Sequence, residues 1–220
     1  DLLDHAYLYA PLTLLDDSGR RLLWGWLREG RTPQAHSAAG WAGAQSIPRE
    51  LSLDANNRLV MCPVPEIETI RGTHHHHENL DLNADPEPIT AHGLALDIVL
   101  EAELQPDGEI VLSVACSADN TLRTDIRYNA HTQELSVNRE FASMSNADER
   151  HTHSATHPLD AGEHLQLRIL LDGSLLEIIA NERTSLTTRI YPTRFEDDGL
   201  RLHGKDCIVR RLDIYEMPSI

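Results

Sequence analysis

Short stretches in which apolar and polar residues alternate recur along the chain, and almost none has the spacing of a helix face. From residue 91 onward these stretches cover residues 94–104, 109–116, 124–129, 134–139, 164–171, 175–180, 185–191, 200–203 and 207–215. Turn residues such as Pro106-Asp107-Gly108 and Asp172-Gly173 separate them. Alternation with a period of two at this regular spacing is typical of antiparallel strands with one buried face. The sequence therefore predicts an antiparallel two-sheet β-sandwich over residues 91–220.

The first 71 residues show the same pattern in two predicted hairpins. One joins residues 7–15 to residues 21–27 through Asp-Asp-Ser-Gly, and the other joins residues 51–53 to residues 58–61 through Asp-Ala-Asn-Asn. A loop is expected over residues 28–46 and a short helical turn over residues 66–71. All three tryptophans lie in the first hairpin or the loop after it. Such a concentration predicts either a local core or a surface on which a ring can stack.

Residues 72–90 are polar and contain Asp-Pro and Glu-Pro pairs, so we expect a connector between two units. This segment contains the tract His74–His77. Neutral imidazoles bind transition metals well, but contiguous histidines on a flexible loop cannot all face one ion. We therefore expect an exposed loop there, and neither a native metal site nor another cofactor.

Composition narrows the range of partners. The net charge of the 220 residues is -16, which argues against nucleic acid and anionic membranes, because both are bound mainly through Lys and Arg. No apolar run approaches the ~20 residues that span a bilayer.

Cys62, Cys116 and Cys207 have no Cys-x-x-Cys spacing, so we expect buried free thiols rather than a disulfide or a reactive thiol. Unpaired thiols favour a cytoplasmic over a secreted location.

Four segments together resemble one enzyme family. They are Asp4-x-Ala6-x-x-Tyr9-Ala10, Arg20-Arg-Leu-Leu-Trp-Gly-Trp26 followed by Gly40-Trp-Ala-Gly-Ala-Gln-Ser-Ile-Pro-Arg-Glu50-Leu51, then Asp172-Gly-Ser-Leu-Leu-Glu177, and Thr187-Thr-Arg189-Ile-Tyr-Pro192. In this order they are similar to glycoside hydrolase family 32, which contains invertases, sucrose-6-phosphate hydrolases, levanases, inulinases and fructan exohydrolases. The first segment departs from the family pattern, since Ala6 stands where the family usually has Gly.

The resemblance implies a five-bladed β-propeller followed by a β-sandwich. This chain would hold the terminal strands of the propeller in residues 1–71, the connector, and the sandwich. The family hydrolyses β-fructofuranosidic bonds with retention, using a nucleophilic carboxylate and an acid/base carboxyl group ~5 Å apart. Its Trp-Met-Asn-Asp-Pro-Asn, Arg-Asp-Pro and Glu-Cys boxes are absent here, and Asn83-Ala84-Asp85-Pro86 is an out-of-order chance match. We therefore expect no catalytic residue in this chain and no hydrolysis by it alone.

The resemblance also suggests three substrate-binding residues. Trp26 would stack on a fructose ring, Tyr9 would supply a hydroxyl at the pocket edge, and Asp4 would accept hydrogen bonds from sugar hydroxyls; a structural role stays open for each. Tyr7 and Leu12 occupy places where some plant sucrose-splitting members have Lys and others have Lys or Gln. Loss of a basic partner for Asp4 leaves levan, inulin and short fructo-oligosaccharides as candidate substrates beside sucrose.

Three functions remain open at this stage. The chain is the C-terminal part of a β-fructosidase, a sugar-binding module that presents a fructan groove, or a structural domain that forms homo-oligomers through its sandwich. We favour the first, because the pocket-wall pattern of residues 4–26 has no purpose in a pure sandwich. Its partners would be a fructoside and the missing N-terminal propeller portion. A propeller fragment should also expose apolar faces that the missing blades cover.

Overall fold

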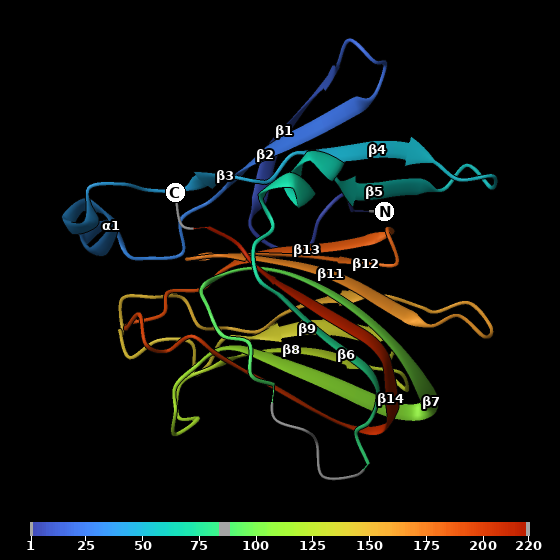
Figure 1. Cartoon of the computed structure of the whole chain (residues 1–220). Coiled ribbons are helices and arrows are strands. Elements are labelled where there is room, and N and C mark those ends of the chain that lie inside the picture. Colours follow the sequence, from blue (N-terminus) through green and yellow to red (C-terminus); the bar gives the residue numbers. More distant parts are fainter. Residues whose placement is uncertain (1, 84–88, 219–220) are drawn as a thin grey trace.

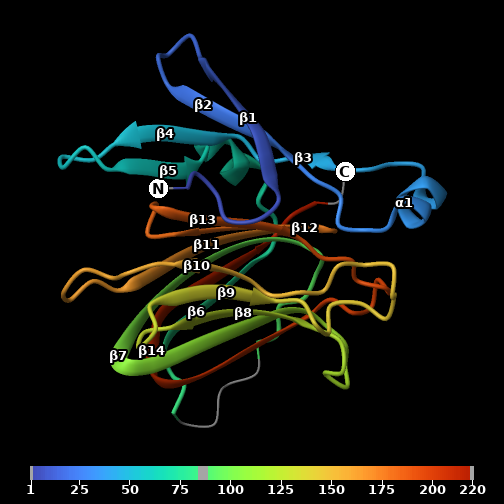
Figure 2. The ribbon, with the colours of Figure 1, turned by 180° about the vertical axis from the view of Figure 1, so that it is seen from behind.

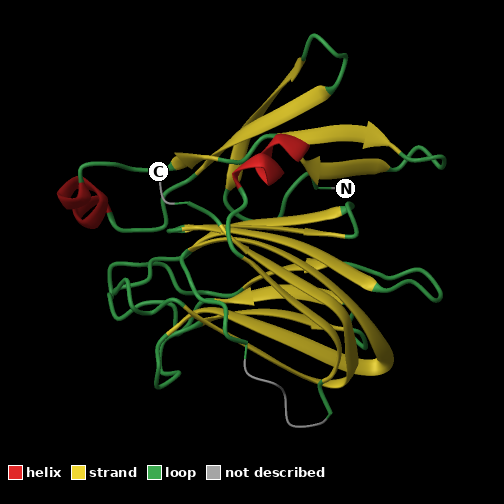
Figure 3. Ribbon diagram, viewed as in Figure 1, coloured by secondary structure: helices red, strands yellow, loops and turns green. Residues whose placement is uncertain are grey.

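Two β-rich units lie one on the other in the computed structural model, which describes residues 2–83 and 89–218 (Figure 1). Strands make up most of both units, and the two helices of the described part are short (Figure 3). Neither helix is long and apolar enough to cross a membrane. The all-β prediction is confirmed.

The first unit is one sheet with the strand order β1-β2-β4-β5, and β3 pairs with β2. Its strands are β1 (Leu8–Leu15), β2 (Arg21–Leu27), β3 (Ala44–Gln45), β4 (Arg49–Leu53) and β5 (Leu59–Pro63). One blade of a β-propeller is a sheet of four antiparallel strands, as is the row β1-β2-β4-β5. Both predicted hairpins are confirmed. Asp16 closes the first turn by accepting from the Ser18 and Arg20 amides, and Asp54 does the same for Asn56 and Arg58.

The predicted loop over residues 28–46 contains a helix, α1 (Pro33–Ala39). Thr32 caps its first turn, Pro33 occupies the first helical position, and Gly40 ends it with a φ of 79°. These are standard helix start and stop signals. The loop prediction missed them because the segment has no apolar face. The predicted helical turn is confirmed as the 3-10 helix η1 (Pro65–Ile70).

The second unit is a single nine-stranded sheet folded over itself into two layers. Its strands are β6 (His74–Asp81), β7 (Ala95–Cys116), β8 (Thr124–Asn129), β9 (Glu134–Asn138), β10 (His153–Thr156), β11 (Leu165–Asp172), β12 (Leu175–Ala180), β13 (Thr184–Arg189) and β14 (Gly199–Glu216). An aliphatic core of leucine, isoleucine, valine and alanine fills the space between the layers. The predicted sandwich is confirmed.

Two long strands connect the layers, where the sequence predicted four shorter ones. The first half of β7 pairs with β11 and the second half with β8, while β14 follows β7 along its length. The expected turn at residues 106–108 is a bend. A Cβ on Gly108 would lie 2.5 Å from the Asp206 carbonyl oxygen, and one on Gly204 would lie 2.5 Å from that of Glu109. The two backbones therefore bend together only because both positions are glycine.

The sequence predicted an exposed loop at the histidine tract of the connector. In the structure this tract begins strand β6. Strand β6 pairs antiparallel with the outer edge of β14, with His74 opposite Tyr215 and His76 opposite Asp213. The polar tract obscured a strand whose paired residues lie 127 to 141 positions away in the sequence. The sandwich thus begins at β6. The look-alike Asn83-Ala84-Asp85-Pro86 extends into residues 84–88, which lie outside the described part.

The three cysteines are free thiols, as expected. Cys116 and Cys207 are buried, whereas Cys62 is half-buried. Burial raises the pKa of Cys116 to about 11 and that of Cys62 and Cys207 to about 12. These thiols therefore stay protonated near neutral pH, which argues against a reactive thiolate.

Ala6 adopts a φ of 147°, a region that favours glycine. Replacing Ala6 with Gly should remove backbone strain and raise the free energy of unfolding by about 1 kcal/mol, after the entropic cost of glycine is subtracted. Urea denaturation followed by tryptophan fluorescence measures this change. Ala38→Gly in α1 is the matched control, and it should lower stability by about 1 kcal/mol. Destabilisation by both substitutions would show that Ala6 is not strained.

Candidate functional site

Tyr9 and Trp26 form an aromatic pair on the β1–β2 hairpin. They are direct cross-strand partners, and their ring centroids lie 6.1 Å apart in an edge-to-face arrangement. Their side chains remain 56% and 48% exposed, so both present ring surface to solvent. The Arg28 guanidinium lies 5.6 Å from the Tyr9 ring centroid. The pair is therefore an exposed aromatic surface rather than a filled local core.

A shallow hollow of about 380 Å³ adjoins the Trp26 ring. It is lined by Ala10, Leu12, Trp24, Gly25, Trp26, Ala42, Gly43, Ala44 and Gln45. A Cβ on Gly43 would lie 2.1 Å from Trp26 Nε1, and Gly43 has a φ of 66°. Only glycine therefore lets the loop after α1 lie against the indole. The lining contains no carboxylate and no histidine among the described residues, so this surface can orient a ring but offers no general acid, base or carboxylate nucleophile.

Within residues 2–83 and 89–218, no layer covers strand β1 beside this hollow. Leu12, Leu14 and Leu15 are 77%, 46% and 59% exposed. Exposed residues stand at consecutive positions of β1, so both of its faces are open to solvent. Figures 1 and 2 show the β1–β2 hairpin directed away from the sandwich. The expected exposure of apolar propeller surface is confirmed.

Asp4 does not join Tyr9 and Trp26. Its side chain is 1% exposed. Asp4 Oδ2 accepts from Arg49 at 3.1 Å, from the Ser185 hydroxyl at 2.5 Å and from the Thr187 hydroxyl at 2.6 Å, while Oδ1 accepts from the Thr187 amide at 3.2 Å. A sugar hydroxyl has no access to this carboxylate. The sequence predicted that Asp4 contacts a sugar. In the structure Asp4 instead lies in a junction between the two units.

Arg49 is the centre of this junction and is fully buried. From β4 its guanidinium reaches the sandwich, where it donates to Glu177 on β12 and to the Thr187 hydroxyl on β13, besides Asp4. Glu177 also accepts from the Ile47 amide at 2.8 Å. Burial lowers the pKa of Arg49, but the carboxylates of Glu177 and Asp4 outweigh it, so the pKa lies above its ordinary value. The buried cation thus stays charged and holds the first unit to the sandwich.

The sequence held a signal for this junction that our interpretation did not use. Glu177 interrupts the apolar run Leu-Leu-Glu-Ile-Ile, and Arg49 begins a strand. Charged residues are almost never fully buried unless they are paired. The segments that carry the family resemblance meet here, since Asp4, Arg49, Glu177 and Thr187 come from four of its stretches.

A second group of contacts extends the junction around Tyr191, after β13. Its hydroxyl donates to Glu29 and accepts from the Gly30 amide at 3.0 Å. Although burial raises the pKa of Glu29, hydrogen bonds from Arg31 and Tyr191 hold it well below its usual range. The Arg31 guanidinium also lies 4.2 Å from the Trp41 ring centroid. Trp41 therefore packs at the junction.

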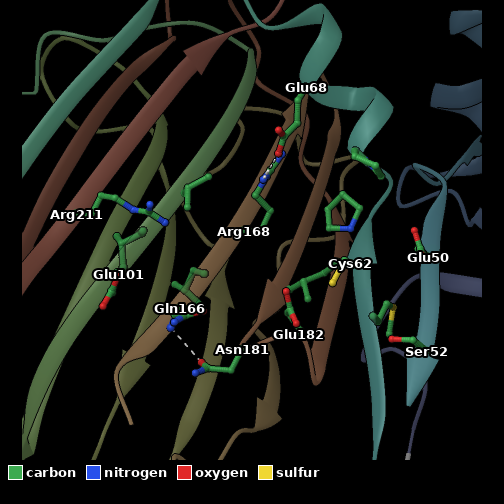
Figure 4. Close-up of a pocket in the computed structure, with 17 residues that line it drawn as sticks. Glu50, Ser52, Cys62, Glu68, Glu101, Gln166, Arg168, Asn181, Glu182 and Arg211 are labelled. Atoms are coloured by element: carbon green, nitrogen blue, oxygen red, sulfur yellow. Dashed lines mark hydrogen bonds and ion pairs between the residues drawn. The ribbon is translucent and has the colours of Figure 1, made fainter. Parts of the chain in front are cut away.

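Between the two units lies a charged groove of about 500 Å³ (Figure 4). Glu50, Ser52 and Cys62 project from the first unit toward Glu101, Arg168 and Arg211 on the sandwich. Both units thus contribute to its walls, and the aromatic hollow is separate from it.

A blade-like sheet joined through a buried ion network to a folded-over sandwich defines a piece of a propeller–sandwich protein. Residues 66–216 match the C-terminal domain of glycosyl hydrolases family 32, and residues 1–63 match the N-terminal domain of that family. The chain therefore belongs to glycosyl hydrolases family 32.

Individual relatives support this assignment. An acid beta-fructofuranosidase of Vicia faba is 31% identical over 235 residues, which cover 87% of this chain and 36% of the relative. Fructan 1-exohydrolase IIa of Cichorium intybus has a similar fold, with a TM-score of 0.85 and 22% identity over 98% of this chain and 49% of that one. Sucrose-6-phosphate hydrolase of Lactobacillus gasseri gives a TM-score of 0.77 and 22% identity over 99% and 43%. The chain thus spans about a third to a half of the proteins it matches.

Proposed function

We propose that this chain is the C-terminal part of a β-fructofuranosidase-type glycoside hydrolase and supplies one wall of its sugar pocket. The uncovered Tyr9–Trp26 pair beside the open strand β1 is the observation that carries this proposal. In the complete enzyme the preceding propeller blades cover β1 and bring the catalytic carboxyl groups to the hollow. The sandwich holds this wall in place through the Arg49 junction.

The chain's own residues account for binding and orientation. The apolar face of a fructose ring packs on the Trp26 indole, and the Tyr9 hydroxyl donates to or accepts from a sugar hydroxyl at the edge of the same surface. Retaining hydrolysis further needs a nucleophilic carboxylate and an acid/base carboxyl group about 5 Å apart. Because the described residues that line the hollow include no carboxylate, we assign both groups to the propeller portion.

Fructose release tests the proposal directly. The 220-residue chain is assayed alone and after co-expression with the polypeptide encoded upstream of Asp1, using sucrose, sucrose 6-phosphate and 1-kestose as substrates; 1-kestose is the ligand in a chicory fructan 1-exohydrolase structure of similar fold. We expect fructose only when both parts are present. Hydrolysis by the chain alone, or an upstream region that encodes none of the three carboxylate boxes, would contradict the proposal.

Trp26→Ala should weaken substrate binding by the completed enzyme about tenfold, which corresponds to about 1.4 kcal/mol of lost ring packing. The effect should appear mainly in KM, because the catalytic carboxyl groups are unchanged. Trp41→Ala is the matched control, since Trp41 is similarly exposed, at 47%, but packs on Arg31 at the junction. An equal rise in KM in both variants would exclude a specific sugar contact by Trp26.

A further inference from the structure

Three potential metal-binding side chains converge at the edge of the sandwich. His74 Nε2 lies 2.7 Å and His76 Nδ1 lies 2.6 Å from the same oxygen, Asp213 Oδ1. One ligand atom from each residue falls within 4.8 Å of the other two. The alternation of strand β6 places His74 and His76 on one face, and Asp213 lies directly opposite His76 on β14. The side chains of His75 and His77 point to the other face.

Both imidazoles are oriented by contacts outside the cluster. The Nε2 of His76 lies 3.0 Å from Glu78 Oε1, so Glu78 holds the ring from the side opposite Asp213. The His74 ring stacks on Tyr215 with centroids 4.3 Å apart and ring planes 10° apart, and the Arg71 guanidinium covers Tyr215 at 3.9 Å. Metal-binding histidines in proteins are commonly held by a carboxylate on the second ring nitrogen. The His76–Glu78 contact has this form.

We propose that His74, His76 and Asp213 form a binding site for a divalent transition-metal cation of the Zn²⁺ class. Two imidazole nitrogens and one carboxylate oxygen are ligands that Zn²⁺ prefers, with a fourth position left to water. Tetrahedral binding requires ligand atoms roughly 3.3 Å apart, which follows from metal–ligand distances of about 2.0–2.1 Å. The half-exposed histidines reach this spacing by small rotations. The proton of His76 then resides on Nε2 and is donated to Glu78.

A bound ion would join the edge strand β6 to β14 through side chains as well as backbone. The Arg211 Nε lies 3.5 Å from Asp213 Oδ2, which leaves Oδ1 toward the histidines. The net charge of -16 adds a favourable field for a cation. The site lies on the sandwich, and it requires neither a sugar nor the missing propeller portion.

Calorimetric titration of the tag-free, EDTA-treated chain with ZnCl₂ tests the site. We expect one saturable site per chain, and at least tenfold weaker binding in His74→Ala, His76→Ala and Asp213→Asn. His77→Ala is the matched control, because its side chain lies on the other face of the same strand. It should bind Zn²⁺ within twofold of the parent chain. Zn²⁺ should also raise the Tm of the parent chain and of His77→Ala, but not that of His76→Ala.

The alternative to a defined site is a disordered tract of four histidines that binds zinc, and the variants distinguish the two. A disordered tract would chelate zinc through any of its members, so His77→Ala would lose as much affinity as His74→Ala and Asp213→Asn would lose none. That pattern, or no saturable binding by a chain with the far-UV circular dichroism of β structure, would overturn the proposal. Variants that fail to show that spectrum are replaced by His74→Gln and His76→Gln, for which the same tenfold loss is expected.

Discussion

Arg49→Ala is expected to lower the free energy of unfolding by about 3–5 kcal/mol, the cost of leaving buried carboxylates without their cation. Asp4 and Glu177 are 1% and 2% exposed and would both lose the guanidinium. Because these residues link the two units, residues 2–63 should separate from the sandwich before the sandwich itself unfolds. Urea denaturation followed by tryptophan fluorescence measures the change, since all three tryptophans lie in the first unit.

Arg127→Ala is the matched control for this substitution. Arg127 pairs with Glu109 on the sandwich surface and is 50% exposed. An exposed ion pair contributes about 0–1 kcal/mol, so this variant should unfold almost like the parent chain. Similar losses in the two variants would show that the Arg49 network does not hold the units together.

Acidification is expected to weaken the same junction through His153. Its ring contacts the Tyr7 ring edge-to-face at 5.1 Å, and its Nδ1 lies 2.9 Å from the Thr188 hydroxyl. Burial, with the neighbouring charge of Arg139 and His151, lowers the pKa of His153 to about 3. The other titratable groups at this contact are Tyr7, whose pKa is raised to about 12 mainly by burial, and its hydrogen-bond partner Glu149.

The direction of the pH effect follows from these values. The unfolded chain binds a proton at His153 below about pH 6.5, whereas the folded chain binds it only near pH 3. The contribution of His153 to the free energy of unfolding is therefore fully present above pH 6.5 and decreases as the pH falls. After allowance for partial exposure, the loss at pH 4 is about 2–3 kcal/mol.

His153→Gln removes this titration and retains polar side-chain atoms. The fall in Tm between pH 7 and pH 4, measured by circular dichroism, should therefore be several degrees smaller in the variant than in the parent chain. His131→Gln is the control, because His131 is 73% exposed and contacts Asp107 rather than a group at the Tyr7 contact. An identical fall in the parent chain and His153→Gln would exclude His153 as the acid-sensitive group.

Local pattern was sufficient to predict most of this fold. The hairpins of the first unit and most of the sandwich strands follow from alternation and from turns closed by residues such as Asp16 and Asp54. Apart from helix α1, whose local start and stop signals were missed, the errors lie where distant backbone decides the structure. Strand β6 forms because β14 offers an edge to a polar tract, and β7 bends without breaking because Gly108 meets the backbone of Asp206.

The candidate site also contains contacts that local sequence predicts and contacts that depend on distant residues. Trp26 and Tyr9 lie on one hairpin, so strand register alone brings them together. The sugar contact of Asp4 was expected because its segment resembles the family pattern, and a structural role was left open. Its partners Ser185 and Thr187 are more than 180 residues away, and no local pattern identifies them. The metal ligands His76 and Asp213 are likewise separated by 137 residues.

The central claim is that this chain contains the last part of a propeller whose remaining blades cover the β1–β2 hairpin. Hydrogen–deuterium exchange of residues 8–15 tests it most directly, in the chain alone and in its complex with the polypeptide encoded upstream. We predict rapid exchange in the isolated chain and at least tenfold slower exchange in the complex, while β11 in the sandwich core stays protected in both. Full protection of residues 8–15 in the isolated monomer, or no slowing in the complex, would contradict the claim.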